Sequence, residues 1–475
     1  MLFALMLYPL IVSVILFFAK SVKLNNVLVI SYALLHVFVA GFFVATGSFN
    51  YLDPILAPYF MMDSLSFIFL ATESLVFLAT SIYSVRYLAR AGTKRHTIFS
   101  ISSMLFLFSM NGVLFASHLT MLWIFIEAST IASAILIYFE RTRTSLEAAW
   151  KYIFICSIGI ALAFVGILLL SPAGVESYFF ADLYGKAPSL IPFWVKLSFV
   201  FMMVGFGTKM GLAPVHSWVP DAYSESPSPI SALISGTLGN ATFLVILRIY
   251  KITILSGEKE FANTLFLLMG FLSLFVASVF IVKAKNYKRM LGYSSIEHYG
   301  ILVIAIATGG YGIFAAMLHV IANSLTKSSL FLTAGNILYS YKSKESSSVD
   351  SLLTRMPFTA WLWIAGFLSI AGAPPSLLFI SEFLTIRELF KNSSFVLLAL
   401  FLIFLVIIFY GMAHTVFSMS FGRNKSEVAE KISFYSHIPQ LVLLIVVFVL
   451  GVYIPDFLAK IIEEAAFIIS GTYLK

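Results

Sequence analysis

The chain has 475 residues, of which 60% are hydrophobic and 11% charged, and its mean hydropathy is +0.98. Soluble domains are only about half apolar, so this composition excludes a water-soluble fold and predicts a chain that crosses a lipid bilayer many times. The net charge is +8, but the basic residues are spread over short loops, which argues against nucleic-acid binding. The single cysteine, Cys156, lies in an apolar run, so we expect no disulfide, no metal centre and no iron–sulfur cluster in this chain.

Apolar segments long enough to cross a membrane, which takes about 20 residues per helix, follow one another along the sequence. The first, Met1 to Ala19, lacks a basic leader and a small-residue cleavage site, so it is predicted to be a membrane helix rather than a signal peptide. We predict an all-α polytopic membrane protein with about 14 transmembrane helices. Their ranges are 2–19, 26–46, 62–88, 98–116, 118–138, 148–171, 193–216, 229–250, 262–283, 290–308, 312–340, 357–390, 393–421 and 437–455.

Lysine and arginine are concentrated in the loops that follow odd-numbered predicted helices. The positive-inside rule therefore places these loops in the cytoplasm and both termini outside. An even number of helices also requires the two termini to share a side. The basic residues that support this orientation include Lys20, Lys23, Arg90, Lys94, Arg95, Arg141, Arg143, Lys283, Lys285, Lys288, Arg289, Arg423 and Lys425.

Two predicted helices carry glycine and proline near their middles. Helix 7 contains Gly211 and Pro214, and helix 12 contains Gly372, Pro374 and Pro375. Proline removes a backbone donor and clashes with the preceding turn, so both helices are predicted to be broken. The breaks are five helices apart, an odd offset that reverses direction across the membrane, as expected of inverted repeats with an ion site at the breaks. Two unrelated proline kinks are the alternative.

We assign the inverted repeats to helices 4–8 and 9–13. The chain is then divided into 1–97 with peripheral helices 1–3, 98–250 with the first repeat, 262–421 with the second repeat, and 437–475 with helix 14 and the C-terminal segment.

Ionisable residues at membrane depth are costly and are therefore candidates for a functional site. Glu127 and Lys209 lie in the first repeat, and Lys327 and Glu382 in the second. Burial disfavours both charges and pairing favours them, so a buried glutamate–lysine pair can bind or release a proton when its geometry changes. The alternative is that each charge is paired only to hold helices together.

Further polar residues extend this set. Lys151, four residues after a glutamate, is either a relay site or an i,i+4 ion pair at the membrane edge. His319, eight residues before Lys327 on the same helical face, is either a proton shuttle or a satisfied core histidine. Three residues that extend the polar line or cap backbone groups freed by the breaks are His216, Glu297 and His298.

Sequence motifs for enzyme chemistry are missing from the chain. It has no HExxH, no paired CxxC, no phosphate-binding glycine loop and no GxSxG. We therefore expect no catalytic residues, metal or cofactor in this chain, and no catalysis by the chain alone.

Residues 205–236, GFGTKMGLAPVHSWVPDAYSESPSPISALISG, resemble the antiporter-like membrane subunits shared by respiratory complex I, Mrp-type cation/proton antiporters and group 4 membrane-bound hydrogenases. The resemblance covers helices 3–13. It continues in LWIFIEAST around Glu127, KRMLGYSSIEHYG from Lys288, HVIANSLTKSSLFLTAGN from His319, and GAPPSLLFISEF ending at Phe383. TSLEAAWKYIFICSIGIALA (144–163) and SSIEHYG (294–300) are most similar to component F of hydrogenase-4 type formate hydrogenlyase complexes.

The resemblance implies a polar axis through the middle of the membrane. Glu127 and Lys209 match the glutamate of helix 5 and the lysine of helix 7 in this family. Lys327 matches the lysine that links the half-channels, and Glu382 occupies the terminal position in helix 12.

Two positions depart from the family pattern. Asn240 stands in helix 8 where some relatives have lysine, and Asn323 stands in helix 11 where histidine is frequent. A neutral amide does not exchange protons at neutral pH, so water must bridge these points if the axis conducts.

The resemblance implies a proton-translocating subunit of a redox-driven complex in the plasma membrane of a prokaryote. The implied complex is a membrane-bound [NiFe] hydrogenase or formate hydrogenlyase, or a complex I-like NADH–quinone oxidoreductase. The implied partners are other antiporter-like and small membrane subunits and a hydrophilic arm, and the nickel–iron and iron–sulfur centres are expected in those partners.

Three alternatives remain open at this point. The chain could serve a multisubunit cation/proton antiporter, an inorganic-carbon uptake system, or a complex in which it is a passive scaffold. Glutamates and backbone carbonyls at the helix breaks would also suit Na⁺, whereas the lysines along the axis favour H⁺.

Overall fold

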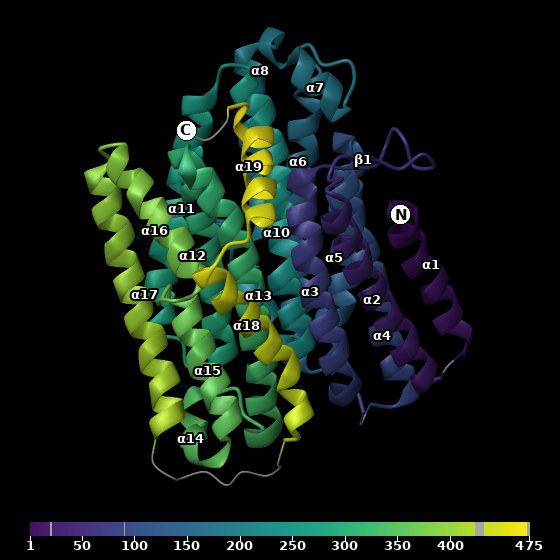
Figure 1. Cartoon of the computed structure of the whole chain (residues 1–475), viewed down its shortest axis with the longest axis vertical. Helices are drawn as coiled ribbons and strands as arrows, with labels where there is room; N and C mark the ends of the chain where they lie inside the picture. Colours follow the sequence, from purple (N-terminus) through teal and green to yellow (C-terminus); the bar gives the residue numbers. More distant parts are fainter. Residues whose placement is uncertain (20, 90, 423–431, 473–475) are drawn as a thin grey trace.

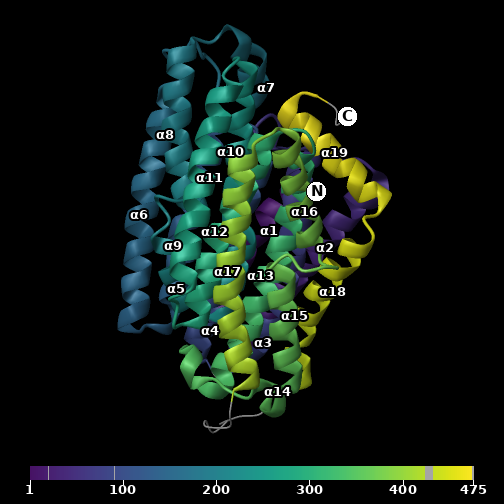
Figure 2. The ribbon, with the colours of Figure 1, turned by 90° about the vertical axis from the view of Figure 1, so that its left-hand side faces the viewer.

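The fold is an elongated bundle of helices that run roughly along its long axis (Figures 1 and 2). The computed structural model describes residues 1–19, 21–89, 91–422 and 432–472. Four of the basic residues used to orient the chain, Lys20, Arg90, Arg423 and Lys425, lie outside the described residues.

In the described part of its first half, the chain contains ten helices and a two-stranded antiparallel hairpin in which Tyr51 pairs with Met62. Two short 3₁₀ segments, η1 and η2, follow α5 and α7. The bounds are α1 Leu2–Ala19, α2 Val22–Thr46, β1 Tyr51–Leu52, β2 Met61–Met62, α3 Ser64–Tyr87, α4 Thr93–Phe115, α5 Leu119–Ile137, η1 Tyr138–Glu140, α6 Arg143–Leu168, α7 Phe180–Lys186, η2 Ala187–Ser189, α8 Pro192–Met210, α9 Trp218–Glu225 and α10 Ser228–Leu255.

The second half contains nine helices among the described residues. The bounds are α11 Lys259–Ile281, α12 Tyr287–Thr308, α13 Tyr311–Tyr341, η3 Ser346–Ser348, α14 Leu352–Arg355, α15 Pro357–Ile370, α16 Leu377–Lys391, α17 Phe395–Phe421, η4 Phe434–Ser436, α18 Ile438–Val452 and α19 Asp456–Ser470. The short helices α7 and α14 lie at opposite ends of the bundle (Figures 1 and 2).

Eleven of the described helices are long and apolar enough to cross a membrane, or up to 12 if α18 and α19, which are bent by 83°, form one span. Each of the 14 predicted ranges contains helix. The counts differ because α13 is made more polar by His319, Asn323 and Lys327, and because predicted helix 12 consists of the two shorter helices α15 and α16. The prediction of an all-α polytopic membrane protein is confirmed.

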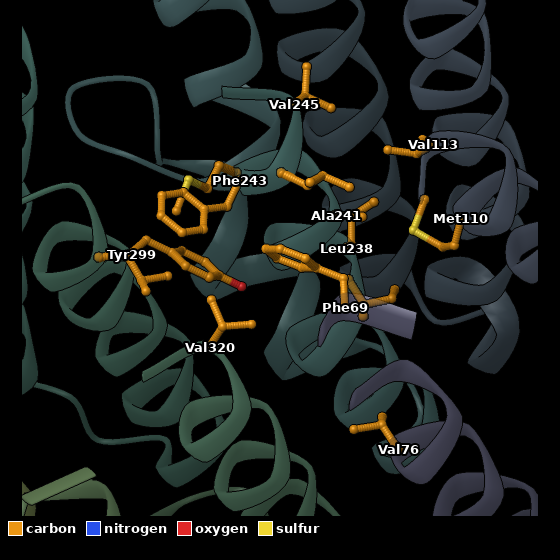
Figure 3. Close-up of a cluster of buried hydrophobic side chains, with 14 of the residues drawn as sticks. Phe69, Val76, Met110, Val113, Leu238, Ala241, Phe243, Val245, Tyr299 and Val320 are labelled. Atoms are coloured by element: carbon orange, nitrogen blue, oxygen red, sulfur yellow. The ribbon is translucent and has the colours of Figure 1, made fainter. Parts of the chain in front are cut away.

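The centre of the bundle is formed by α10, α12 and α13. In the most apolar stretches of α10 and α12, 100% and 94% of the residues are buried, compared with 22% in α17 at the periphery. Figure 3 shows part of this core, where Phe69 of α3, Phe243 of α10, Tyr299 of α12 and Val320 of α13 point toward one another. Lipid cannot satisfy hydrogen-bonding groups, so the polar residues of these central helices face the protein interior.

Helical structure is interrupted at both positions where the sequence predicts a break. α8 ends at Met210, and Gly211 follows with a φ of 96°. A Cβ at Gly211 would also lie 2.6 Å from Cγ2 of Val219, so glycine is required here for conformation and for space. α15 ends at Ile370, Gly372 has a φ of 65°, and α16 begins at Leu377.

Lys288, which is counted above among the charged residues of the loops, lies in a helix. Asn286 caps α12, because its side chain accepts hydrogen bonds from the backbone N–H groups of Lys288 and Arg289. The helix therefore begins before the predicted start at residue 290. Lys288 is fully buried in its first turn, and its Nζ donates to the Ser226 carbonyl at 2.6 Å. The prediction that Lys288 is a loop residue is wrong.

Candidate functional site

A first polar cluster lies where α5, α6 and α8 meet. Glu127 of α5 is partly buried, and its carboxylate accepts hydrogen bonds from Ser157 Oγ of α6 at 2.9 Å and from Thr130 Oγ1 at 3.4 Å. Lys209, in the last turn of α8, is fully buried. Its Nζ donates to Thr130 Oγ1 at 2.7 Å and to the Tyr152 hydroxyl of α6 at 2.6 Å.

The expected direct pair of Glu127 and Lys209 is replaced by a bridge. Among the described residues no ion pair joins them, and Thr130 lies between the two charges, contacting both. A hydroxyl has one proton and two lone pairs, so Thr130 can accept from the ammonium group while its own proton is directed to the carboxylate. The Ile126 carbonyl is a second acceptor for this proton, also at 3.4 Å, so the chain from Lys209 to Glu127 is complete when the Thr130 proton is directed to the carboxylate.

The close packing of α6 against α8 holds Tyr152 beside Lys209. A Cβ at Gly205 of α8 would lie 2.5 Å from the backbone N of Ala163, so only glycine allows the two helices to approach this closely. A Cβ at Gly159 of α6 would likewise lie 2.6 Å from Cβ of Thr208.

Lys151 forms the ion pair that is one of its two predicted alternatives. Its Nζ forms ion pairs with Glu147 at 2.7 Å and with Asp221 at 3.0 Å, and its side chain is 45% exposed. Asp221 of α9 also pairs with Arg289 at 2.9 Å. Lys151 therefore belongs to an exposed ion-pair network that links α6, α9 and α12.

A second polar cluster lies between α12, α13 and α16. A hydrogen bond of 3.0 Å joins Nδ1 of His298 to Nε2 of His319, and another of 2.9 Å joins Nδ1 of His319 to Ser381 Oγ. Glu297 accepts from Ser294 Oγ at 3.2 Å, and its carboxylate lies 4.0 Å from Nε2 of His298. Both histidines are completely or almost completely buried.

Lys327 and Glu382 lie at this second cluster without forming a direct pair. Lys327 is fully buried, and its Nζ donates to the Leu291 carbonyl of α12 at 2.9 Å. One carboxylate oxygen of Glu382 on α16 and one ring nitrogen each of His298 and His319 lie within 4.8 Å of one another. A Cβ at Gly372 would clash with the Glu382 carboxylate, so the glycine of the second helix break leaves the space that this side chain occupies.

His298, His319 and Glu382 could together hold a divalent metal ion, because two imidazoles and a carboxylate are a suitable ligand set for zinc. The ring nitrogens that face each other are, however, already joined by a hydrogen bond. A metal ion would have to replace that hydrogen bond, so the present geometry fits a proton shared between the two rings better than a metal site.

The two asparagines that depart from the family pattern lie on the neighbouring helices α10 and α13. Asn240 donates to the Gly236 carbonyl at 2.9 Å and to Ser324 Oγ. Asn323 is fully buried, and neither of its amide atoms has a hydrogen-bond partner in the part of the chain that the structure describes. Buried polar atoms without partners are rare in proteins and mark positions that water can occupy.

The helix-break residues themselves lie at the surface of the bundle or near it. Pro214, Pro374 and Pro375 are exposed. His216, in the connection between α8 and α9, is half-buried, and its Nδ1 has no hydrogen-bond partner within the described ranges. The structure thus brings Glu297 and His298 into the second cluster, but it leaves His216 at the first break.

The sequence profile of the family described as "NADH:quinone oxidoreductase/Mrp antiporter, TM" matches residues 116–408. This chain belongs to that family. Its relatives include a hydrogenase-4 component F homolog of Methylacidiphilum infernorum (isolate V4), 33% identical over 414 residues that cover 84% of this chain and 86% of the relative. Hydrogenase-4 component B of Escherichia coli (strain K12) is 28% identical over 345 residues, which cover 70% of this chain and 51% of that protein.

Solved structures of multisubunit complexes contain subunits with the same fold. A chain of the archaeal membrane-bound sulfane sulfur reductase has a TM-score of 0.90 at 21% identity, with 99% of this chain and 97% of that chain covered. A chain of the Mrp complex from Dietzia sp. DQ12-45-1b has a TM-score of 0.89 at 17% identity, with 98% and 97% covered. The predicted membership of the antiporter-like family is confirmed.

Several residues of this family member's clusters were not singled out in the sequence. Thr130 lies three residues after Glu127 on the same helical face, which marks it as a neighbour of that carboxylate, but Ser381 directly precedes Glu382, and adjacent helical residues point in different directions. Tyr152 offers no such signal. Glu73, a carboxylate in the middle of predicted helix 3, satisfies the rule that selected Glu127 and was overlooked.

Proposed function

We propose that this chain is a proton-translocating, antiporter-like membrane subunit of a redox-driven complex. The observation that carries the proposal is the pair of buried clusters, each containing a fully buried lysine that is bonded to neutral oxygen atoms rather than to a carboxylate. A lysine held in this way can exist with or without its proton, because no fixed counter-charge locks its ionised form.

In the first cluster a proton can move in one concerted step. Lys209 Nζ gives a proton to the Thr130 oxygen while the hydroxyl proton of Thr130 passes to the Glu127 carboxylate. The result is a neutral lysine and a neutral glutamic acid, so charge and protons balance. The distance of 2.7 Å from Lys209 to Thr130 is typical of a hydrogen bond, whereas the distance of 3.4 Å from Thr130 to Glu127 is long and must shorten for the second transfer.

In the second cluster a proton can move along the hydrogen bond that joins His298 and His319. A proton that arrives on one ring is passed to the other, and the Glu382 carboxylate is close enough to receive it. Electron transfer in partner subunits would change the charge at one end of this axis, and the change would be transmitted from cluster to cluster.

We propose a membrane-bound [NiFe] hydrogenase or formate hydrogenlyase, or a complex I-like oxidoreductase, as the host complex. The hydrogenase-4 relatives support the first of these. Other membrane subunits and a hydrophilic arm would be the partners, with the nickel–iron and iron–sulfur centres in that arm. We further propose a prokaryotic plasma membrane, with the odd-numbered loops in the cytoplasm and both termini outside, because the basic loops favour that orientation.

Substitution of the buried lysine tests the proton-translocating role. We expect Lys209→Met to lower proton uptake per electron transferred, measured in inverted membrane vesicles, by about tenfold or more, because the proton chain loses its donor. The matched control is Lys196→Met on the same helix, since Lys196 is exposed and paired with Glu258 at 3.0 Å. Assembly is checked by mass spectrometry of the purified complex. Normal coupling in an assembled Lys209→Met complex would contradict the proposal.

A cation/proton antiporter without redox chemistry is the second candidate, favoured by the fold shared with the Mrp complex. Metal analysis of the complex purified through a tag on this chain separates the two. Nickel with iron–sulfur subunits would identify a hydrogenase, and iron without nickel would indicate a complex I-like enzyme. Membrane partners without metal would favour the antiporter or an inorganic-carbon uptake system.

A further inference from the structure

Glu73 of α3 is a buried carboxylic acid that the relay described above does not use. Its side chain is 3% exposed, and its Oε1 has no hydrogen-bond partner among the described residues. An ionised carboxylate at membrane depth costs several kcal/mol without a partner, so the resting side chain is expected to carry a proton.

A small cavity separates Glu73 from the asparagine of α10. It is lined by Phe69, Thr72, Glu73, Leu114, Gly236, Thr237, Asn240 and Ala241, and its volume of about 10 Å³ is close to what one water molecule needs. Two of the lining residues, Phe69 of α3 and Ala241 of α10, are labelled in Figure 3. Oδ1 of Asn240 is also unpartnered within the described residues, so a water molecule here would meet two free acceptor atoms.

A second cavity begins about one helical turn further along α3. Its wall includes Phe77, four residues after Glu73 on α3, and Leu233, three residues before Gly236 on α10. The rest of the lining includes Thr80, Ser81, Ser84, His96, Ser100 and Ser103, and the volume is about 20 Å³. Ser81 Oγ and His96 Nε2 have no hydrogen-bond partner in the described part of the chain. The polar residues of this second cavity therefore extend from near Glu73 toward the connection between α3 and α4.

On its inner side Glu73 is connected to the central axis. Asn240, across the small cavity, donates to Ser324 Oγ of α13, which is next to the unpartnered Asn323. A Cβ at Gly236 would lie 2.5 Å from Ser328 Oγ and 3.1 Å from Cγ1 of Val76, so this glycine allows α3, α10 and α13 to meet at one point. The same helix α13 carries Lys327 one turn later.

We propose that Glu73 is a proton-carrying residue on a side branch that connects the α3–α4 end of the bundle with the Asn240–Asn323 segment of the axis. The inference rests on the proposed function. The protonated Glu73 carboxyl group gives its proton to a water molecule beside Asn240, and the resulting carboxylate takes a proton from a hydronium ion that arrives through the cavity toward the α3–α4 connection, so that charge and protons balance. Glu73 thus supplies the titratable group that the two asparagines lack.

Substitution of Glu73 by glutamine tests the branch, because the amide keeps the shape of the side chain but cannot exchange a proton. We expect Glu73→Gln to lower coupled proton uptake about tenfold in the assembled complex, and Glu73→Asp to retain part of it. Glu140→Gln is the matched control, since Glu140 is exposed and paired with Arg95. Normal pumping in Glu73→Gln together with loss in Lys209→Met would overturn the branch alone. Normal pumping in both variants would overturn the proposed function as well.

Thiol oxidation tests the same branch without a change of the carboxyl group. In a Cys156→Ser background, Ser81→Cys should be oxidised by hydrogen peroxide, a probe little larger than water, because the proposed branch brings water into this second cavity of about 20 Å³. Ile82→Cys is the control, since Ile82 is exposed on the outside of the bundle, where lipid is expected. The branch is supported if the cysteine at position 81 is modified much more than the cysteine at position 82. Equal or lower modification at position 81 overturns it. This test does not depend on whether the Glu73→Gln variant assembles.

Discussion

At the scale of single residues, the buried charges are joined by neutral groups. Lys209 reaches Glu127 through Thr130, and Lys327 is held by a backbone carbonyl. A direct ion pair in a low-dielectric interior is strong enough to fix both charges. A hydroxyl bridge leaves the lysine free to lose its proton, which a relay requires.

Removal of the bridging hydroxyl should interrupt the first cluster. We expect Thr130→Val, which keeps the shape of the side chain, to lower coupled proton uptake about tenfold, because Lys209 then has no path to Glu127. Thr130→Ser retains the hydroxyl and should pump almost normally. The ratio of protons to electrons in inverted vesicles distinguishes the two variants. Equal pumping by Val and Ser would show that the bridge is not used.

The space beside Glu382 gives a second prediction at this scale. Gly372→Ala places a Cβ against the Glu382 carboxylate and should lower pumping several-fold by displacing it from the two histidines. Alanine in the left-handed region also costs about 1–2 kcal/mol. Gly309→Ala separates the two effects, because Gly309 has a φ of 69° and a Cβ added to it would have no atom within 4 Å. A loss of pumping in Gly309→Ala as large as in Gly372→Ala would point to backbone strain instead.

At the scale of helices, glycine decides how closely charged elements approach. Gly205 allows α8 to touch the backbone of α6, and this contact places Tyr152 next to Lys209. We expect Gly205→Ala to destabilise the protein by about 1–3 kcal/mol through overpacking and to weaken the Lys209–Tyr152 hydrogen bond. Thermal unfolding and proton pumping should both be affected. Gly41→Ala on α2 has open space, so it should leave pumping unchanged and should not destabilise the protein.

The helices and the charged site residues could be predicted from the sequence for physical reasons. Long apolar runs predict membrane helices, and a glutamate or lysine inside such a run is conspicuous because lipid disfavours it. The partners Thr130, Tyr152 and Ser381 could not be assigned in the same way, because hydroxyl side chains are common in membrane helices and sequence does not reveal which helices face each other. Hydropathy also missed α19, an amphipathic helix whose Glu464 accepts a hydrogen bond from Ser64 at 2.6 Å.

At the scale of the whole molecule, α3 is attached to the first predicted repeat by a buried ion pair. Asp63 caps α3, because its Oδ1 accepts from the backbone N–H of Ser66 at 2.8 Å. Its Oδ2 forms an ion pair with Arg248 of α10 at 2.6 Å, and Arg248 also donates to Ser66 Oγ at 3.1 Å. Since Glu73 lies on the same helix, this pair helps to hold the proposed side branch against α10.

Removal of one member of the Asp63–Arg248 pair should destabilise the protein more than removal of both. Arg248→Leu leaves Asp63 as a buried charge without its partner, and we expect a loss of about 3–5 kcal/mol in the free energy of unfolding. The double variant Asp63→Ser with Arg248→Leu removes the orphaned charge and keeps a capping side chain for α3, so it should recover most of that loss. Thermal unfolding of the purified complexes measures both values. A double variant no more stable than Arg248→Leu would mean that the arginine stabilises the α3–α10 contact through its packing rather than through its charge.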